Sequence, residues 1–138
     1  MDVRTTIQEK LDKILLPDGV LSFHIRRVEV DAIEGHDVKV NPDEYAVFRL
    51  VSSPVRTFGD GDPLLKRHYV EVNYYYKYDK TDPRYAAAVK RLKAVRKEIL
   101  QDRHFRLAND ESDIPNTGEN PYRGITVEFL YVGVMDYE

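Results

Sequence analysis

The sequence predicts an α+β fold, with a mostly antiparallel sheet of four to five strands and two helices packed on one face. Three observations lead to this prediction. Apolar residues recur at helical spacing near the N-terminus, polar and apolar residues alternate over 67–78, and Asp82-Pro83 opens a second helical stretch. The expected order is helix, three strands, helix and one or two strands, which favours two layers.

Length and composition limit the class of protein. The chain has 138 residues, and we expect residues 1–138 to form a single domain. It has no cysteine, so disulfides, thiolate metal ligands and thiol nucleophiles are excluded. No apolar run approaches a membrane span and no signal-peptide pattern is found, so we expect no membrane partner and a cytosol-like environment. The net charge of −3 gives no argument for specific nucleic acid binding.

The two predicted helices span 2–15 and 83–101. Asp2 caps the first, and a proline and a glycine follow its end. Asp82 caps the second, with Pro83 in its first turn. The expected core stripes are Val3, Ile7, Leu11, Ile14 and Leu15 in the first helix, and Tyr85, Ala88, Val89, Leu92, Val95 and Ile99 in the second.

Three strands are expected between the helices. The first spans 20–30, where a change of parity predicts a bend near Arg26-Arg27. The second spans 45–52 and is almost continuously apolar, which is typical of a strand covered on both faces. The third spans 67–78, and its alternation predicts one buried side and one side that is wet or meets a partner.

After the second helix the sequence predicts one or two strands: a last one over 122–135 and, in the two-strand alternative, a short one over 104–107. Three polar loops connect the predicted strands. Each loop has few apolar residues, yet each holds an isolated one. Such a residue either docks into a neighbouring subunit or folds back on its own domain, and the pattern leaves both open. The loops and their apolar residues are 31–43 with Ile33, 53–63 with Phe58, and 108–121 with Ile114.

The sequence holds no recognisable catalytic pattern. Zinc-hydrolase helices, phosphate loops, dinucleotide fingerprints and nucleophile elbows are all missing. Asp60 and Asp62 flank a glycine, and a simple turn is favoured there over a cation site. We therefore interpret the chain as a non-enzymatic protein without cofactor or metal. The alternative is a small enzyme that uses His68 or His104 with loop carboxylates.

A basic stripe runs along the second predicted helix, opposite its apolar side. Its residues are Lys90, Lys93 and Lys97. A solvated helix face explains this stripe most simply. The alternative is a small nucleic-acid-binding module that uses these lysines to contact the backbone of a duplex.

Four segments together resemble the tail-completion family of long-tailed bacteriophages, the tail terminator or tail-to-head joining proteins. They are VRTTIQEKLDKIL, EYAVFRLVSS after a polar loop, HYVEVNYYYKYD leading into Asp82-Pro83, and PYRGITVEFLYVGV. The resemblance is one of layout and composition over most of the chain. It rests on no short diagnostic motif.

The resemblance implies a virion subunit at the head-proximal end of a tail. It implies a ring, commonly a hexamer, that caps the tail tube, stops tube polymerisation and offers a surface to the head connector or head-completion protein. The expected partners are copies of this chain, the tube protein and that connector, and another neck subunit is the alternative. We expect the interfaces to include Ile33, Arg56, Phe58, Asp60, Asp62, Tyr69, Tyr75 and Ile114.

Overall fold

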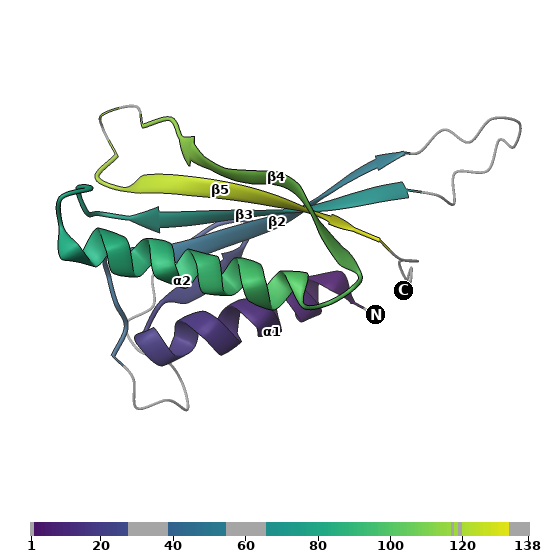
Figure 1. The fold of residues 1–138 in the computed structure, drawn as a ribbon, viewed down its shortest axis with the longest axis horizontal. Coiled ribbons are helices and arrows are strands. Elements are labelled where there is room, and N and C mark those ends of the chain that lie inside the picture. The colour runs from purple at the N-terminus through teal and green to yellow at the C-terminus, as the bar shows by residue number, and fades with distance from the viewer. Residues whose placement is uncertain (1, 28–38, 55–65, 117, 119, 133–138) are drawn as a thin grey trace, which may run out of the picture.

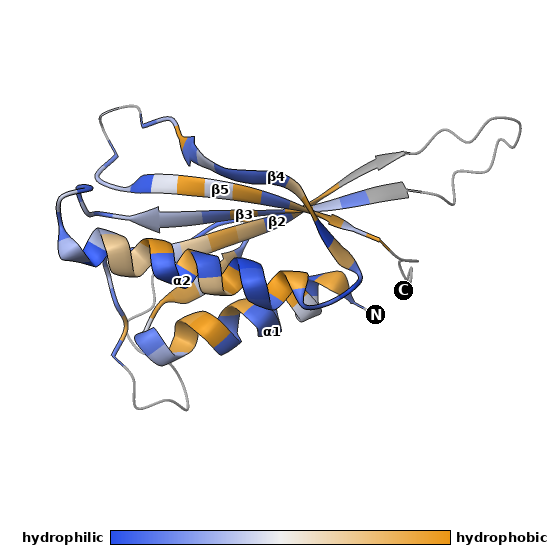
Figure 2. Cartoon of the chain, in the orientation of Figure 1, coloured by the Kyte–Doolittle hydropathy of each residue, from blue (hydrophilic) through white to orange (hydrophobic). Residues whose placement is uncertain are grey.

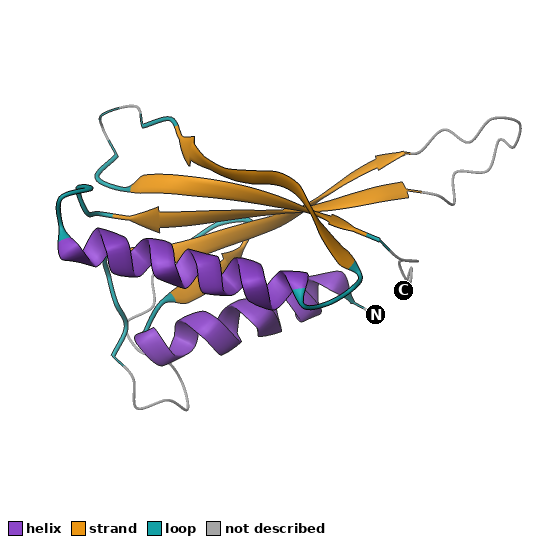
Figure 3. Ribbon diagram, in the orientation of Figure 1, coloured by secondary structure: helices purple, strands orange, loops and turns teal. Residues whose placement is uncertain are grey.

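The computed structural model describes residues 2–27, 39–54, 66–116, 118 and 120–132. Two helices form one layer over a five-stranded sheet, so the predicted α+β class is confirmed (Figures 1 and 3). The elements are α1 (Val3–Leu15), the 3-10 turn η1 (Leu16–Asp18), β1 (Leu21–His24), β2 (Glu44–Pro54), β3 (Lys66–Tyr76), α2 (Pro83–Leu100), β4 (Phe105–Ile114) and β5 (Arg123–Tyr131).

The sheet is mixed, with the strand order β1-β2-β3-β5-β4. The pairs β2–β3, β3–β5 and β4–β5 are antiparallel. The pair β1–β2 is parallel, with Leu21 opposite Tyr45 and His24 opposite Phe48. A parallel pair needs a long connection, because the chain must return to the end of the sheet at which the first strand began. Residues 25–43 supply that connection, and β1 and β4 become the two edges.

Both helices begin where the sequence predicts. The Asp2 carboxylate accepts a hydrogen bond from the Arg4 amide at 3.0 Å, and Asp82 caps the Arg84 amide at 2.9 Å. Gly19 caps the C-terminal end of η1 and has a φ of 75°. A Cβ at Gly19 would collide with the carbonyl oxygen of Lys39, so this position suits glycine alone. The buried helix residues are Val3, Ile7, Leu11, Leu15, Ala88, Leu92, Val95 and Ile99, with Ile14, Tyr85 and Val89 packed partly against them.

Alternating side chains turn one sheet face toward the helices. In β3 the buried set is Val70, Val72, Tyr74 and Tyr76, and in β5 it is Ile125, Val127, Phe129 and Tyr131, as their alternation predicts. β2 corrects a prediction. Its Ala46 and Phe48 are fully buried, whereas Arg49 on the other face is exposed. The strand is therefore covered on one face, because no described element packs on the side opposite the helices.

The first strand is shorter than predicted. β1 ends at His24 because Ile25 takes a φ of 75°, which extended backbone does not accommodate. The bend lies at Ile25 and Arg26, where the Arg26 amide donates to the His24 carbonyl at 2.9 Å. The rest of the predicted strand lies outside the described residues.

The predicted loop at 108–121 is wrong over its first half, 108–114. β4 runs on to Ile114 and pairs with β5, with register shifts around Asn109. Its polar side chains suit an edge strand that is open to solvent, and β4 is mostly hydrophilic in Figure 2. Pairing needs only backbone groups, so polarity of the side chains did not prevent a strand here. The last predicted strand, 122–135, corresponds to β5, which begins at Arg123 and ends at Tyr131.

A buried carboxylate joins the two layers. Glu44, at the start of β2, is only 2% exposed. It accepts hydrogen bonds from Tyr74 (2.6 Å), Tyr78 (3.0 Å), Asn41 (3.0 Å) and Arg91 (2.9 Å to each oxygen). Arg91 also donates to Asp18 in η1 at 3.1 Å. Burial, reinforced by the Glu44 carboxylate, raises the pKa of Tyr74, which keeps this phenol a donor.

Replacing Glu44 by Ala is expected to destabilise the protein by about 3–5 kcal/mol, because Arg91 and two buried hydroxyls lose their acceptor. Urea unfolding monitored by circular dichroism measures the change. Glu44→Gln, which keeps the volume and one oxygen, is the control and should lose less. An alanine variant as stable as the wild type would contradict this role of Glu44.

Candidate functional site

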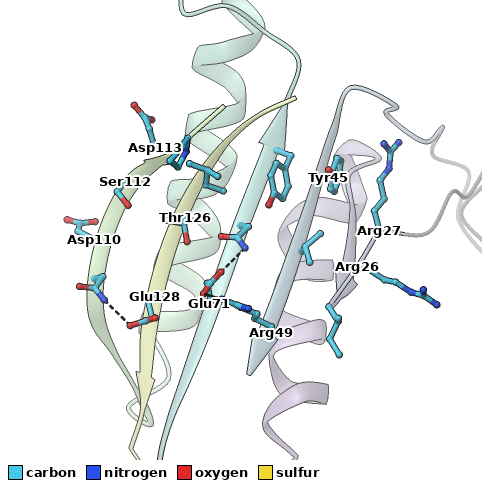
Figure 4. A pocket seen from close by; sticks show the side chains of 17 residues that line it. Arg26, Arg27, Tyr45, Arg49, Glu71, Asp110, Ser112, Asp113, Thr126 and Glu128 are labelled. Atoms are coloured by element: carbon cyan, nitrogen blue, oxygen red, sulfur yellow. Dashed lines mark hydrogen bonds and ion pairs between the residues drawn. The ribbon is translucent and has the colours of Figure 1, made fainter. Parts of the chain in front are cut away.

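The sheet face opposite the helices, hereafter the open face, is the candidate functional site. Among the described elements no helix covers it, and it holds a groove of about 990 Å³. The groove runs across the strands from the turn after β1 to β4 and the start of the following turn. Figure 4 shows side chains from all these strands directed to this one side.

Paired polar side chains line the middle of the groove. Arg49 on β2 donates to Glu71 on β3 at 2.9 Å, and Asn73 donates to the other Glu71 oxygen at 2.9 Å. On the next strands Asn109 donates to Glu128 at 2.8 Å. Burial by itself raises the pKa of Glu71, but the hydrogen bonds from Arg49 and Asn73 outweigh it and lower this pKa. On the floor, Glu71 is thus paired with a charge on the neighbouring strand, and Glu128 is hydrogen-bonded by a neutral amide.

An aromatic cluster holds a cation at one end of the groove. Tyr45 stacks on Tyr75 with ring centroids 4.9 Å apart, and Tyr122 meets Tyr45 edge to face at 5.0 Å. The Arg27 guanidinium lies 4.6 Å from the Tyr45 ring centre and donates to the Tyr122 hydroxyl at 3.0 Å. Burial raises the pKa of Tyr45 and of Tyr75. These contacts hold Arg27 in a defined orientation.

Gly124 lets two predicted interface residues come together. It lies on β5 opposite Tyr75 and Ile114. A Cβ at this position would stand 2.7 Å from the Ile114 Cδ1 and 3.1 Å from the Tyr75 ring. The side chains of these two neighbours therefore close over a residue that has none.

The two ends of the groove carry opposite charge. Ile25, Arg26 and Arg27, in the turn after β1, form what we call the basic rim. Asp110, Asp113 and Ile114, on the edge strand β4, form the acidic rim. In Figure 4 Arg26 and Arg27 lie at one side of the groove and Asp110 and Asp113 at the other, with Arg49, Glu71 and Thr126 between them.

The predicted interface residues divide into two groups. Tyr75 and Ile114 line the groove, and Tyr69 lies on the same face of β3 beyond it. Ile114 is the last residue of a paired strand, which corrects its prediction as a loop anchor. Ile33, Arg56, Phe58, Asp60 and Asp62 lie outside the described residues, so their interface role stays a prediction.

The basic stripe and the histidines lie away from the groove. Lys90, Lys93 and Lys97 are exposed on α2, which belongs to the helix layer. His68 is 4% exposed, and it and Phe105 are both in register with Tyr131. The ring of His104 stacks near Tyr131 at 6.1 Å. Neither histidine is among the described residues that line the groove.

Sequence reasoning missed the residues that give the groove its charge pattern, chiefly Arg26, Arg27, Asp110 and Asp113. Asp110 and Asp113 fell in a stretch predicted to be loop. Tyr45 was missed because β2 was interpreted as buried on both faces. The alternation of Tyr45, Val47 and Arg49 with Ala46 and Phe48 was the available indication of a half-open strand.

This arrangement suits contact with a macromolecule. The groove is broad, it crosses the whole sheet, and its polar floor is hydrogen-bonded within itself. Within the described part of the chain, no group of three histidine, cysteine or acidic residues is placed to hold a metal ion. No helix in that part is long and apolar enough to span a membrane.

Replacing Gly124 by Val is expected to lower the free energy of unfolding by about 1–3 kcal/mol, because the new side chain displaces Tyr75 and Ile114. Urea unfolding measures the loss, and near-ultraviolet circular dichroism reports the tyrosine packing. Thr126→Val, two residues further along the same face, is the control and should stay within about 0.5 kcal/mol of wild type. Equal stability of the two variants would refute the close packing over Gly124.

The lowered pKa of Glu71 predicts a dependence of stability on pH. Its contribution is complete above the ordinary value of 4.5 and is lost as the pH falls through the lower pKa of the folded state. Glu71→Gln should therefore cost up to about 1 kcal/mol at neutral pH and progressively less below pH 4.5. Chemical unfolding at a series of pH values tests this. A difference from wild type that does not shrink in acid would disprove it, and the non-titrating Thr126→Val gives the baseline.

Comparison with known proteins places the fold. A scan against protein-family models finds no matching family, and no curated protein matches in sequence. Among solved structures, a similar one is the sheath/tube terminator of an extracellular contractile injection system (PVC), determined by cryo-electron microscopy in the extended state. The match covers 98% of this chain and 56% of that chain, at 11% identity and a TM-score of 0.50. The chain thus spans about half the length of that terminator, and the two share a fold.

Proposed function

We propose that this chain is a structural virion subunit that caps the head-proximal end of a phage tail tube, stops tube polymerisation and joins the tail to the head connector. The observation that carries this proposal is the fold shared with the sheath/tube terminator, which extends over 98% of the chain. The resemblance to the tail-completion family rests on the order of helices and strands, and this order is the one found in the structure of this chain.

The geometry of the two layers supports a joining role. A terminating subunit must bind a growing tube on one side and present a different surface on the other. The open face and the helix layer are two unlike surfaces of one thin domain, the first with paired polar residues and tyrosines, the second with exposed lysines. Such a subunit forms rings through heterologous contacts, in which one patch meets a different patch of the next copy.

The groove chemistry supports the proposal of a non-enzymatic role. Glu71 and Glu128, the carboxylates of its floor, are hydrogen-bonded to Arg49, Asn73 and Asn109. A general acid or base needs access to a substrate proton, and such pairing serves strand cohesion instead. We propose that the chain acts by binding alone.

A second candidate function is contact with duplex DNA through α2. Lys90, Lys93 and Lys97 are all exposed on one side of this helix. Under the structural proposal these lysines are a solvated surface outside the tube lumen, and the protein elutes from immobilised duplex DNA at low salt. Salt-dependent retention that is lost on reversing the three charges would favour the DNA-binding function instead.

The proposal is tested by tube assembly. Tube protein from the tail of the same particle is allowed to polymerise with and without this chain, and tube lengths are measured by negative-stain electron microscopy. We expect shorter tubes with extra density at one end, because a bound cap blocks addition of the next tube ring. The variant Lys90→Glu/Lys93→Glu/Lys97→Glu is the control and should cap equally well. Unchanged tube lengths at saturating concentration of the chain would refute the proposal.

A further inference from the structure

We propose that copies of this chain join head to tail, with the basic rim of one copy packed against the acidic rim of the next. This inference rests on the proposed function in one respect, because it supplies the subunit contact from which a terminating ring would be built. Its evidence is independent of that function, since it comes from charge, exposure and strand order alone.

The basic rim is exposed and held in place. Ile25 is 66% exposed at a φ of 75°, a conformation that turns an apolar side chain outward at the sheet edge. Arg26 and Arg27 follow it, and both are exposed. The ring of Tyr45 and the Tyr122 hydroxyl fix Arg27, and Tyr122 is itself anchored by donating to the Pro42 carbonyl at 2.8 Å. Arg27 therefore meets a partner with little loss of side-chain freedom.

The acidic rim lies on the opposite edge strand. The side chains of Asp110 and Asp113 are 62% and 72% exposed. Their intramolecular ion pairs, with Arg96 at 3.6 Å and Lys80 at 4.0 Å, are long and exposed, so a closer partner replaces them at small cost. Ile114 places an apolar side chain beside them, as Ile25 does at the other rim. Figure 4 shows Asp110 extending away from the sheet on one side and Arg26 on the other.

Strand order prevents the two rims from meeting within one chain. β1 and β4 are the outermost strands, separated by β2, β3 and β5. Four strand spacings of about 4.8 Å place the rims roughly 19 Å apart. Two copies of the same rim would repel each other, whereas unlike rims attract. The charge pattern therefore favours contacts that join unlike rims over contacts that join like rims. A head-to-tail contact joins them once per interface, and it closes into a ring or continues as a filament.

The occupant of each rim is thus a second copy of this chain. Each rim offers one isoleucine, exposed at Ile25 and half-buried at Ile114, with two charges of a single sign, and the complement of each rim lies on the same protein. A tube subunit or another virion protein is the competing occupant, and the experiments below separate these cases.

Cysteine trapping tests the contact directly, because the native chain has no cysteine. Arg26→Cys and Asp110→Cys chains, one enlarged by a tag, are mixed in equal amounts and oxidised with copper phenanthroline in air, both free at high concentration and bound to tube ends. We expect a mixed disulfide dimer in about tenfold excess over a control pair with Lys90→Cys in place of Arg26→Cys. A disulfide within one chain is excluded by the rim separation. Equal yields from both pairs in both states would overturn the proposal.

Charge exchange gives a second test. Arg26→Glu/Arg27→Glu and Asp110→Lys/Asp113→Lys should each weaken self-association at least about 100-fold, because each puts like charges at the contact. An equal mixture of the two variants should assemble in alternation, and a single chain with all four changes should assemble with copies of itself. Sedimentation velocity, with and without tube ends, measures this. Loss in each variant with no recovery in the mixture would overturn the pairing of these two rims.

The two proposals fail in different ways. If the rim cysteines cross-link but tubes elongate unchanged, the contact between copies stands and the capping function fails. If the chain caps tubes and the rim variants cap as well as wild type without cross-linking, the function stands and the rim contact fails. In that case a tube subunit occupies the rims or they remain exposed.

Discussion

The buried carboxylate of Glu44 is the interaction on which the two-layer arrangement depends. It lies at the first residue of β2, and its partners come from β3, from the turn before β2 and from α2. An ionised group that is 2% exposed is tolerated only where hydrogen bonds compensate for lost water. Arg91 also binds Asp18 in η1, directly after α1, so a single arginine connects α2, the end of the first helical segment and the Glu44 carboxylate. This contact ties the helix layer to the sheet on the face that the alternating apolar residues of the strands bury.

The open face exists because both helices pack on the opposite face of the sheet. With both helices on one side, alternate residues of β2, β3 and β5 face the other side, where they pair with each other across strands. A face made in this way is stable without a covering layer, since Glu71 and Glu128 are matched by neighbours rather than by a partner. Its floor carboxylates already have hydrogen-bond partners on the same sheet.

Prediction from sequence worked where the determinants are local. The caps at Asp2 and Asp82 and the alternation in β3 and β5 depend on residues a few positions apart, and the structure has all of them. It failed where partners are distant. β4 pairs with β5 although its sequence is polar, and β2 is half-open although its sequence is apolar. Of the candidate interface residues that the structure describes, Tyr75 and Ile114 line the groove, and nothing local indicated that Arg26 would oppose Asp110 across the sheet.

By itself the sequence determined two amphipathic helices, a strand with one buried side and the absence of cysteine chemistry, because period, caps and composition are local properties. Only the tertiary structure decided that β1 pairs in parallel with β2, that β4 is the far edge, and that opposite charges stand on the two rims. The physical reason is that strand order arises from backbone hydrogen bonds between segments far apart in the chain. Every residue other than proline offers the same backbone donor and acceptor, so the side-chain pattern of one segment does not identify its partner.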